Sequence, residues 1–264
     1  MNDEDLGVYL NVETVKEPFL ARNFPTATGK LWEGTGSDFW PGHWSGTFEP
    51  ETDAAEEDRS QLDATATALS TLSGDALLDA LAPLVDVDQV IHYWAVESVV
   101  SHHDGYHENG NNFFVYIDDE IGRIQLFPWD TDFDYAPVGS SIFLANTSLP
   151  RELYKIPETR AQFLAEVEAL LDTWESSEQL AEIERIRGLL TPIPQRSGMR
   201  EELQMMIIWQ KDLKRWIASR VANVSTQLAN APATVPPDQP EHWCEVFPTD
   251  ARAWVPARPG PWRR

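Results

Sequence analysis

Cysteine and long apolar runs are both scarce in this sequence of 264 residues. Its single cysteine, Cys244, excludes an intrachain disulfide and says nothing firm about the redox compartment. No stretch approaches the roughly 18 consecutive apolar residues that a membrane-spanning helix requires. The sequence therefore predicts a protein without a membrane span.

Positive charge is also scarce, since 20 Lys and Arg residues face 43 Asp and Glu residues and leave a formal net charge of −23. This balance disfavours nucleic acid as a partner, because binding to a phosphate backbone depends on clustered Lys and Arg. It is compatible with basic protein substrates, with metal ions, or simply with a solvated acidic surface. A hydrophobic fraction of 42% and 11 tryptophans indicate a folded chain, and the length allows one domain or two.

The sequence does contain a spaced set of acidic and amide side chains. Asp104 lies in a His-rich loop, Asn111 and Asn112 follow it, and Asp130 and Asp132 come after a Phe-Pro-Trp run. A carboxylate, a carboxamide and a close carboxylate pair are what phosphoryl transfer uses to orient a hydroxyl and hold magnesium. Two close carboxylates repel each other unless a cation is present, so metal binding is favoured over an exposed acidic turn.

Two predicted strands bring these side chains together. Residues 112–117 and 122–127 are rich in aromatic and β-branched side chains and flank an acidic turn at 118–120. Because a hairpin returns the chain on itself, the residues before its first strand and after its second lie at the same end. We therefore expect Asp104 and Asp130 to converge.

A buried helix is predicted at residues 87–100, where apolar residues recur at helical intervals. It would deliver the loop that carries Asp104. Asp86 and Asp88 lie at its start, where negative charge is favoured, and we expect them to cap it.

The rest of the chain is mostly helical by pattern. Residues 64–82 predict helix, and two long helices are predicted at 159–190 and 195–228. Residues 1–48 indicate a strand near residues 7–13, a short helical turn and a loop rich in Gly and Trp.

These residues resemble the CotH family, the spore-coat and surface proteins with an atypical protein-kinase-like fold. The resemblance covers roughly the first half of the chain. It rests on the segments YWAVE (93–97), HHDGY (102–106), NNFFVY (111–116) and FPWDTD (127–132), with weaker support from GVYLNVE (7–13) and LWEG (31–34).

The resemblance implies a role for each matching residue. Asp104 corresponds to the catalytic aspartate, which accepts the proton or hydrogen bond of the substrate hydroxyl. Asp130 corresponds to the metal-binding aspartate, with Asp132 as a second ligand candidate. His102, two residues before Asp104, is the expected scaffold of the loop.

An amide oxygen for the metal would come from Asn111 or Asn112. In ordinary protein kinases the amide follows the catalytic aspartate by five residues. Asn109 satisfies that count, but its neighbours Glu108 and Gly110 indicate a turn, and we favour Asn111 and Asn112.

The resemblance further implies transfer of the ATP γ-phosphate, with Mg²⁺ or Mn²⁺, to Ser or Thr hydroxyls of secreted or cell-surface proteins, including basic, serine-rich ones. It implies an α+β fold made mostly of the helical C-terminal lobe, with a short hairpin that carries the site. We predict this domain over residues 1–230 and a Pro-rich, poorly ordered tail over 231–264.

One departure concerns the phosphate-anchoring lysine of a kinase N-terminal lobe. Lys16 and Lys30 both follow the expected first strand among Pro and Gly residues, so neither is a credible substitute. We expect that most of this lobe is missing and that the sequence is truncated. A noncatalytic, metal-stabilised surface or adhesion module is therefore the alternative.

A zinc hydrolase is a further alternative. His102, His103 and His107 flank Asp104, and imidazoles with a carboxylate can bind zinc and activate water. Adjacent histidines in an extended backbone point in different directions, however, which disfavours a shared metal.

Overall fold

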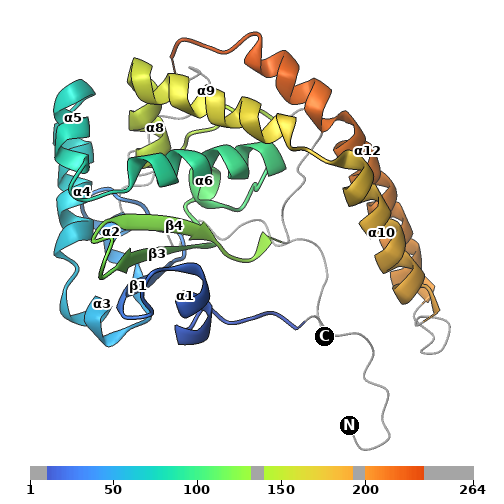
Figure 1. The fold of residues 1–264 in the computed structure, drawn as a ribbon, viewed down its shortest axis with the longest axis horizontal. Helices are drawn as coiled ribbons and strands as arrows, with labels where there is room; N and C mark the ends of the chain where they lie inside the picture. Colours follow the sequence, from blue (N-terminus) through green and yellow to red (C-terminus); the bar gives the residue numbers. More distant parts are fainter. Residues whose placement is uncertain (1–10, 132–139, 193–199, 235–264) are drawn as a thin grey trace, which may run out of the picture.

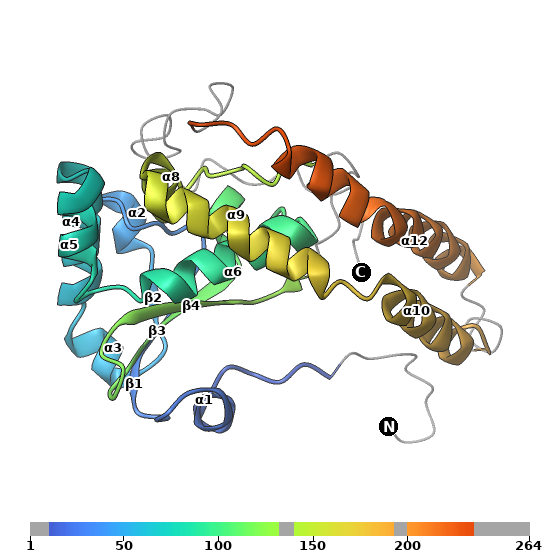
Figure 2. The ribbon, with the colours of Figure 1, turned by 45° about the horizontal axis from the view of Figure 1, so that its top comes forward.

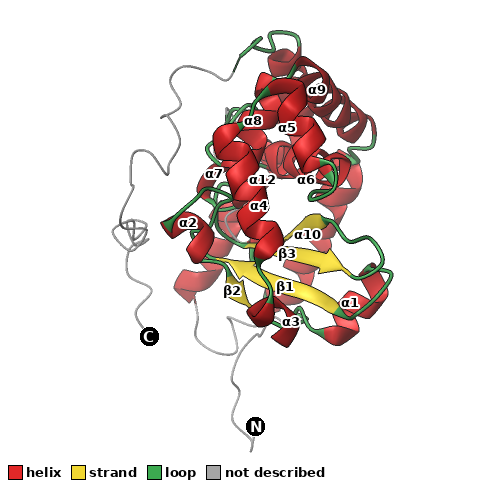
Figure 3. Ribbon diagram, turned by 90° about the vertical axis from the view of Figure 1, so that its left-hand side faces the viewer, coloured by secondary structure: helices red, strands yellow, loops and turns green. Residues whose placement is uncertain are grey.

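The computed structural model describes residues 11–131, 140–192 and 200–234 and has an α+β fold (Figure 1). One antiparallel sheet has the strand order β2-β1-β3-β4 and forms a layer beneath most of the helices (Figure 3). Its strands are β1 (Gly29–Gly34), β2 (Glu49–Pro50), β3 (Phe113–Asp118) and β4 (Ile124–Pro128). The helices are α1 (Glu17–Asn23), α2 (His43–Gly46), α3 (Asp53–Glu57), α4 (Ser60–Thr71), α5 (Gly74–Leu81), α6 (Val87–Val100), α7 (Tyr106–Asn109), α8 (Ser148–Lys155), α9 (Pro157–Asp172), α10 (Ser176–Leu190) and α12 (Arg200–Leu228).

The predicted hairpin is confirmed as β3 and β4. Phe113 lies opposite Pro128 and Ile117 opposite Ile124, so the two strands run antiparallel. All six residues of β3 are buried, as expected for a central strand with a neighbour on each edge.

The loop predicted within residues 1–48 is partly wrong, because β1 occupies its middle. Trp32 lies opposite Val115 in β3 and is almost fully buried. Pairing along the whole of β3 overrides the weak strand propensity of the two glycines that bound β1. Of the strand predicted near 7–13, residues 11–13 are in no strand and the remainder lies outside the described residues.

Helices cover both faces of the sheet. On one face α6 lies between the sheet and α9, as both Figure 1 and Figure 2 show. The rings of Trp94 in α6 and Phe163 in α9 stack with centroids 3.8 Å apart. On the other face α1 packs through Phe19 and Phe24 onto Phe127. The sheet is therefore fixed from both sides.

Helix α6 has the predicted bounds, but the predicted caps are wrong at its start. Asp86 occupies the N-cap position without a side-chain capping bond, and its carboxylate pairs instead with Arg123 at 3.3 Å. The Asp88 carboxylate accepts a hydrogen bond from Gln162 of α9. Both aspartates thus bind neighbouring elements rather than their own helix end.

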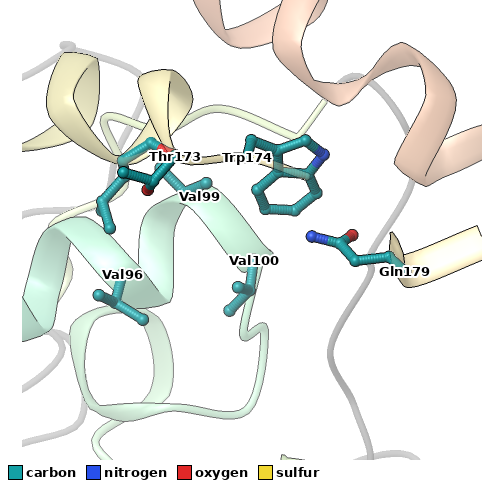
Figure 4. A pocket seen from close by; sticks show the side chains of 7 residues that line it. Val96, Val99, Val100, Thr173, Trp174 and Gln179 are labelled. Atoms are coloured by element: carbon teal, nitrogen blue, oxygen red, sulfur yellow. The ribbon is translucent and has the colours of Figure 1, made fainter. Parts of the chain in front are cut away.

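The helix predicted at 159–190 is two helices, because α9 ends before α10 begins at a new angle. At the break Trp174 packs against Trp216 of α12, with ring centroids 5.9 Å apart. The same break leaves a small pocket, of about 120 Å³, that Val99 of α6 and Trp174 both line (Figure 4).

The stretch predicted as one helix at 64–82 is likewise divided, into α4 and α5. Helix α12 confirms most of the last predicted helix, and residues 195–199 of that prediction lie outside the described residues.

The first residues of the predicted tail are attached to the body. Tyr154 donates a hydrogen bond to the carbonyl of Pro232, and Arg160 donates to that of Ala233. Residues 235–264 lie outside the described part. No helix among the described residues is long and apolar enough to cross a membrane.

Candidate active site

The loop that carries Asp104 begins where α6 ends. Ser101 adopts a left-handed backbone conformation (φ 55°), and the amide of His102 bonds back to the carbonyl of Glu97 at 2.9 Å. The chain therefore leaves the helix through a tight turn. It then forms the single helical turn α7, which ends at Gly110 with φ 61°.

A buried carboxylate, that of Glu97, holds this loop in shape. One oxygen accepts hydrogen bonds from the Tyr93 hydroxyl at 2.6 Å and the Tyr106 amide at 2.9 Å. The other accepts from the amide of His107 at 3.0 Å and from its Nδ1 at 3.1 Å, while the Nδ1 of His102 lies 3.3 Å from the first oxygen. A carboxylate only accepts, so each of these nitrogens is a donor.

The charge of Glu97 is compensated by these donors. Burial by itself raises the pKa of Glu97, but hydrogen bonds from the rings of His102 and His107 outweigh it and hold the pKa well below its ordinary value. Glu97 is therefore ionised at neutral pH and gathers its donors from both sides of Asp104.

Gly105 is required where the loop passes Glu97. A Cβ atom there would lie 2.3 Å from a Glu97 carboxylate oxygen and 2.6 Å from the Nδ1 of His102. Any larger residue would push the carboxylate or the loop aside. Gly105 thus lets the loop pass close enough to Glu97 to form the hydrogen bonds that position Asp104.

Asp104 accepts a hydrogen bond on each carboxylate oxygen. Asn109 donates to Oδ1 at 2.5 Å, and Asn112 donates to Oδ2 at 3.1 Å. Two amides, one from the last residue of α7 and one from the segment that follows it, thereby fix the carboxylate, which is partly exposed. Of the two predicted amides, the structure brings Asn112 to Asp104, whereas Asn111 forms no side-chain hydrogen bond within the described part of the chain.

The hairpin brings Asp130 to the same place, as its geometry predicts. The side-chain amide of Asn112 lies 3.5 Å from the carbonyl of Asp130, and the amide of Trp129 donates to the carbonyl of Asn112 at 2.8 Å. Asn112 and Asp130 have positive φ angles of 50° and 45°, which are uncommon for residues other than glycine. Asp132 lies outside the described residues.

Of the three histidines near Asp104, two lie against one carboxylate and the third lies against another. His102 and His107 are buried and turn to Glu97, while exposed His103 pairs with Glu108 at 2.7 Å. Within the described ranges no group of three or more His, Cys, Asp and Glu side chains could hold a metal ion. The arrangement does not support the zinc-hydrolase alternative, and it agrees with His102 as a scaffold.

A second buried carboxylate, Asp38, supports the loop from the opposite side. It accepts from the Tyr106 hydroxyl at 3.0 Å and from the Ser148 amide at the start of α8 at 2.9 Å. Burial, together with the nearby charge of Asp38, raises the pKa of Tyr106 well above its ordinary value, so the phenol stays protonated and donates. Sequence reasoning missed both supports; a carboxylate on the buried face of the helix at 87–100 was the available signal for Glu97.

Comparison with known families now bears on these residues. A family model described as CotH kinase protein matches residues 1–223. The chain belongs to the CotH kinase family. The match confirms the resemblance seen in the sequence and extends it through most of α12. A search of curated proteins found no match.

Membership of the CotH kinase family directs attention to Asn109, which lies five residues after Asp104. Kinases place an amide five residues after the catalytic aspartate, and Asn109 has that position. Its neighbours Glu108 and Gly110 do form a turn, as the sequence indicates, but this turn is what carries the Asn109 amide to Asp104.

Proposed function

We propose that this site transfers the γ-phosphate of ATP to a Ser or Thr hydroxyl of a protein, within a protein-kinase-like fold of which the described residues form mostly the helical lobe. The observation that carries the proposal is the Asp104 carboxylate held by two amides beside Asp130. Family membership supports the same chemistry.

Asp104 would receive the substrate hydroxyl. Its two hydrogen bonds fix the orientation of the carboxylate, and partial exposure leaves room for an incoming side chain. A carboxylate so placed accepts the hydroxyl proton as the oxygen attacks phosphorus in line with the leaving group. Orientation rather than covalent chemistry is the main contribution of such a residue.

The donor set suits Mg²⁺ or Mn²⁺. The side-chain oxygens of Asn109, Asn112 and Asp130 accept no hydrogen bond from any described residue, and hard divalent cations prefer carboxylate and amide oxygens. These three residues would hold the cation, with Asp132 as a further candidate. When bound, the cation neutralises charge on the transferring phosphate. We favour Asn109 and Asn112 over Asn111 because both contact Asp104.

The acceptor is proposed to be a basic, serine-rich protein that is secreted or at the cell surface. The net charge of −23 supports this choice, since an acidic enzyme attracts a basic substrate and speeds its encounter.

The test measures transfer of labelled γ-phosphate from ATP to a basic, serine-rich protein with Mg²⁺ or Mn²⁺. We expect Asp104→Asn to lower the rate by about 10²- to 10⁴-fold, the usual effect of losing a general base. We expect Asp130→Asn to abolish transfer, whereas Asp119→Asn, in the exposed turn between β3 and β4, leaves the rate unchanged. Equal rates in all variants would reject the assignment. No transfer by the wild type, together with stabilisation by Mg²⁺ that Asp130→Asn removes, would favour the noncatalytic module.

The same assay separates the neighbouring amides. Asn109→Ala removes a hydrogen bond to Asp104, and we expect it to lower the rate and to raise the Mg²⁺ or Mn²⁺ concentration that gives half-maximal rate. Asn111→Ala is the matched control, because the Asn111 side chain forms no hydrogen bond with any described residue, and we expect wild-type behaviour. The reverse result would restore Asn111 as the metal ligand.

A further inference from the structure

Helix α10 and the part of α12 up to Ile217 form an antiparallel pair that projects from the rest of the fold (Figure 1, Figure 2). Their shared seam is buried through Ile183, Trp216 and Ile217. The seam explains why the two helices stay together. It does not cover their outer surface.

Exposed apolar side chains gather on this pair of helices. Of eight large hydrophobic residues exposed among those described, six belong to it: Ile186, Leu189, Met205, Ile207, Ile208 and Trp209. The others, Val12 and Leu72, lie elsewhere in the chain. Met205 and Trp209 are each two positions from Ile207, so they lie on a different face of α12 from Ile207. Exposed apolar residues are normal singly, whereas several on one projecting element are typical of an interaction region.

A basic pocket lies beside one of these residues, Ile207. It has a volume of about 360 Å³ and is lined by Arg187 of α10 and by Ile207, Gln210, Lys211, Lys214 and Arg215 of α12. Four of the six lining residues are cationic, in a chain with only 20 Lys and Arg against 43 Asp and Glu. The pocket therefore differs in charge from the chain as a whole.

Intramolecular ion pairs neutralise the pocket only in part, because two carboxylates face its four cations. Glu184 pairs with both Lys214 and Arg187, and Asp212 pairs with Arg215. Lys211 forms no ion pair with any described residue. The Arg187 and Arg215 pairs are largely exposed, where such contacts are weak and exchange readily.

We propose that this pocket binds an acidic segment of a partner protein, with an apolar side chain of that segment beside Ile207. Carboxylates of the segment would face Lys211 and the cations next to it. A protein segment fits better than an anionic membrane, because Glu182, Glu184 and Asp212 interrupt the basic surface and would repel a continuous layer of phosphates. The proposal does not depend on phosphoryl transfer.

Fluorescence anisotropy with labelled 12-residue peptides tests this. The probe alternates Glu with Leu; comparison peptides alternate Lys with Leu and Glu with Ser. We expect only the Glu and Leu peptide to bind, more weakly as NaCl is raised. Lys211→Glu and Ile207→Ser should each weaken binding by about tenfold, equivalent to 1.4 kcal/mol.

The matched controls are Arg22→Glu on α1 and Leu72→Ser after α4, both exposed and remote from the pocket. We expect them to bind as the wild type does, and circular dichroism checks that every variant is folded. Unchanged affinity in Lys211→Glu and Ile207→Ser would overturn the proposal, as would equal binding of the Lys and Leu peptide. Self-association in sedimentation velocity that Ile207→Ser abolishes would overturn it in favour of a second copy, and binding to anionic vesicles but not to the peptide would overturn it in favour of a membrane.

Discussion

Glu97 shows how one buried side chain can position another that does the chemistry. Its carboxylate lies under the loop, 2% exposed, and its donors come from α6, from the loop and from the start of α7. A buried charge is stable only when it is fully hydrogen-bonded, so the loop has to keep these donors in place. Glu97 is therefore a positioning residue for Asp104.

Replacing Glu97 by Gln keeps the shape of the side chain but turns one acceptor into a donor that faces other donors. We expect the free energy of unfolding at pH 7 to fall by about 3–5 kcal/mol, the usual effect of breaking a buried charged network. Urea titration measures this change. Glu57→Gln, on the exposed end of α3, is the control and should unfold as the wild type does.

The sign of the pH dependence follows from the lowered pKa of Glu97. As pH falls below about 4.3, the ordinary value for Glu, the unfolded chain takes up a proton before the folded chain does. This part of the stability is thus complete above that pH and is lost toward lower pH. The Glu97→Gln variant lacks it, so its unfolding free energy should fall less steeply between about pH 5 and 3. Equal acid slopes in both proteins would show that the carboxylate is not held as described.

At the scale of elements, α12 fixes the end of α6 that carries the loop. Arg220 is fully buried and donates hydrogen bonds to the carbonyls of Ser98 at 2.6 Å and Val99 at 2.8 Å. Its guanidinium lies over the ring of Trp216, 5.1 Å from the centroid. Burial lowers the pKa of Arg220 to about 10, so it remains charged at pH 7, where a cation at a helix C-terminus is favourable.

We expect Arg220→Met to destabilise the fold by about 2 kcal/mol, because two carbonyls and the helix dipole lose a charged donor. Amides of residues 101–107 should also exchange hydrogen faster, since α6 then ends without its anchor. Urea titration and hydrogen exchange measure the two effects. Arg215→Met, exposed on the same helix, is the control. Faster exchange spread over the whole chain, with none specific to 101–107, would contradict this role.

The elements that the sequence predicts best are those determined by neighbouring residues. Helix α6 and the hairpin of β3 and β4 follow from local apolar spacing and a polar turn. The break between α9 and α10 does not, because it depends on contact between Trp174 and Trp216, 42 positions apart by their numbering. Strand β1 likewise cannot be predicted from its own residues, because it forms a strand only through pairing with β3, which is distant in the sequence.

The site divides in the same way. The hairpin predicts that Asn112 and Asp130 meet, and the short segment between Asp104 and the first strand makes the approach of Asp104 expected. Asn109 has the kinase spacing from Asp104, but its turn-forming neighbours made a role at the site look unfavourable from the sequence. The place of Glu97 on the buried face of a predicted helix signals that it needs partners, but the sequence does not identify them, because its donors meet only once the loop has folded.

At the scale of the whole molecule, the net charge of −23 destabilises the folded state. Carboxylates on the surface repel one another at neutral pH, and this repulsion is relieved when the chain expands on unfolding. Exposed ion pairs such as Lys16 with Glu51 and Arg59 with Asp63 oppose the effect, but such pairs are weak because solvent screens them. The excess of acidic residues should therefore decide how stability responds to salt.

We expect NaCl to stabilise the fold at low concentration. Raising it from about 0.01 to 0.15 M shortens the screening length from about 30 to 8 Å, which weakens repulsion between distant carboxylates more than attraction within close pairs. Urea titration at fixed pH is the measurement, because urea is uncharged and leaves the ionic strength unchanged. Screening predicts a rise in unfolding free energy that levels off above about 0.15 M, whereas exclusion of salt from the surface would give a steady rise to molar concentrations. A fall in stability over the low range would mean that the ion pairs outweigh the repulsion, and that the acidic surface of this chain is better balanced than its composition indicates.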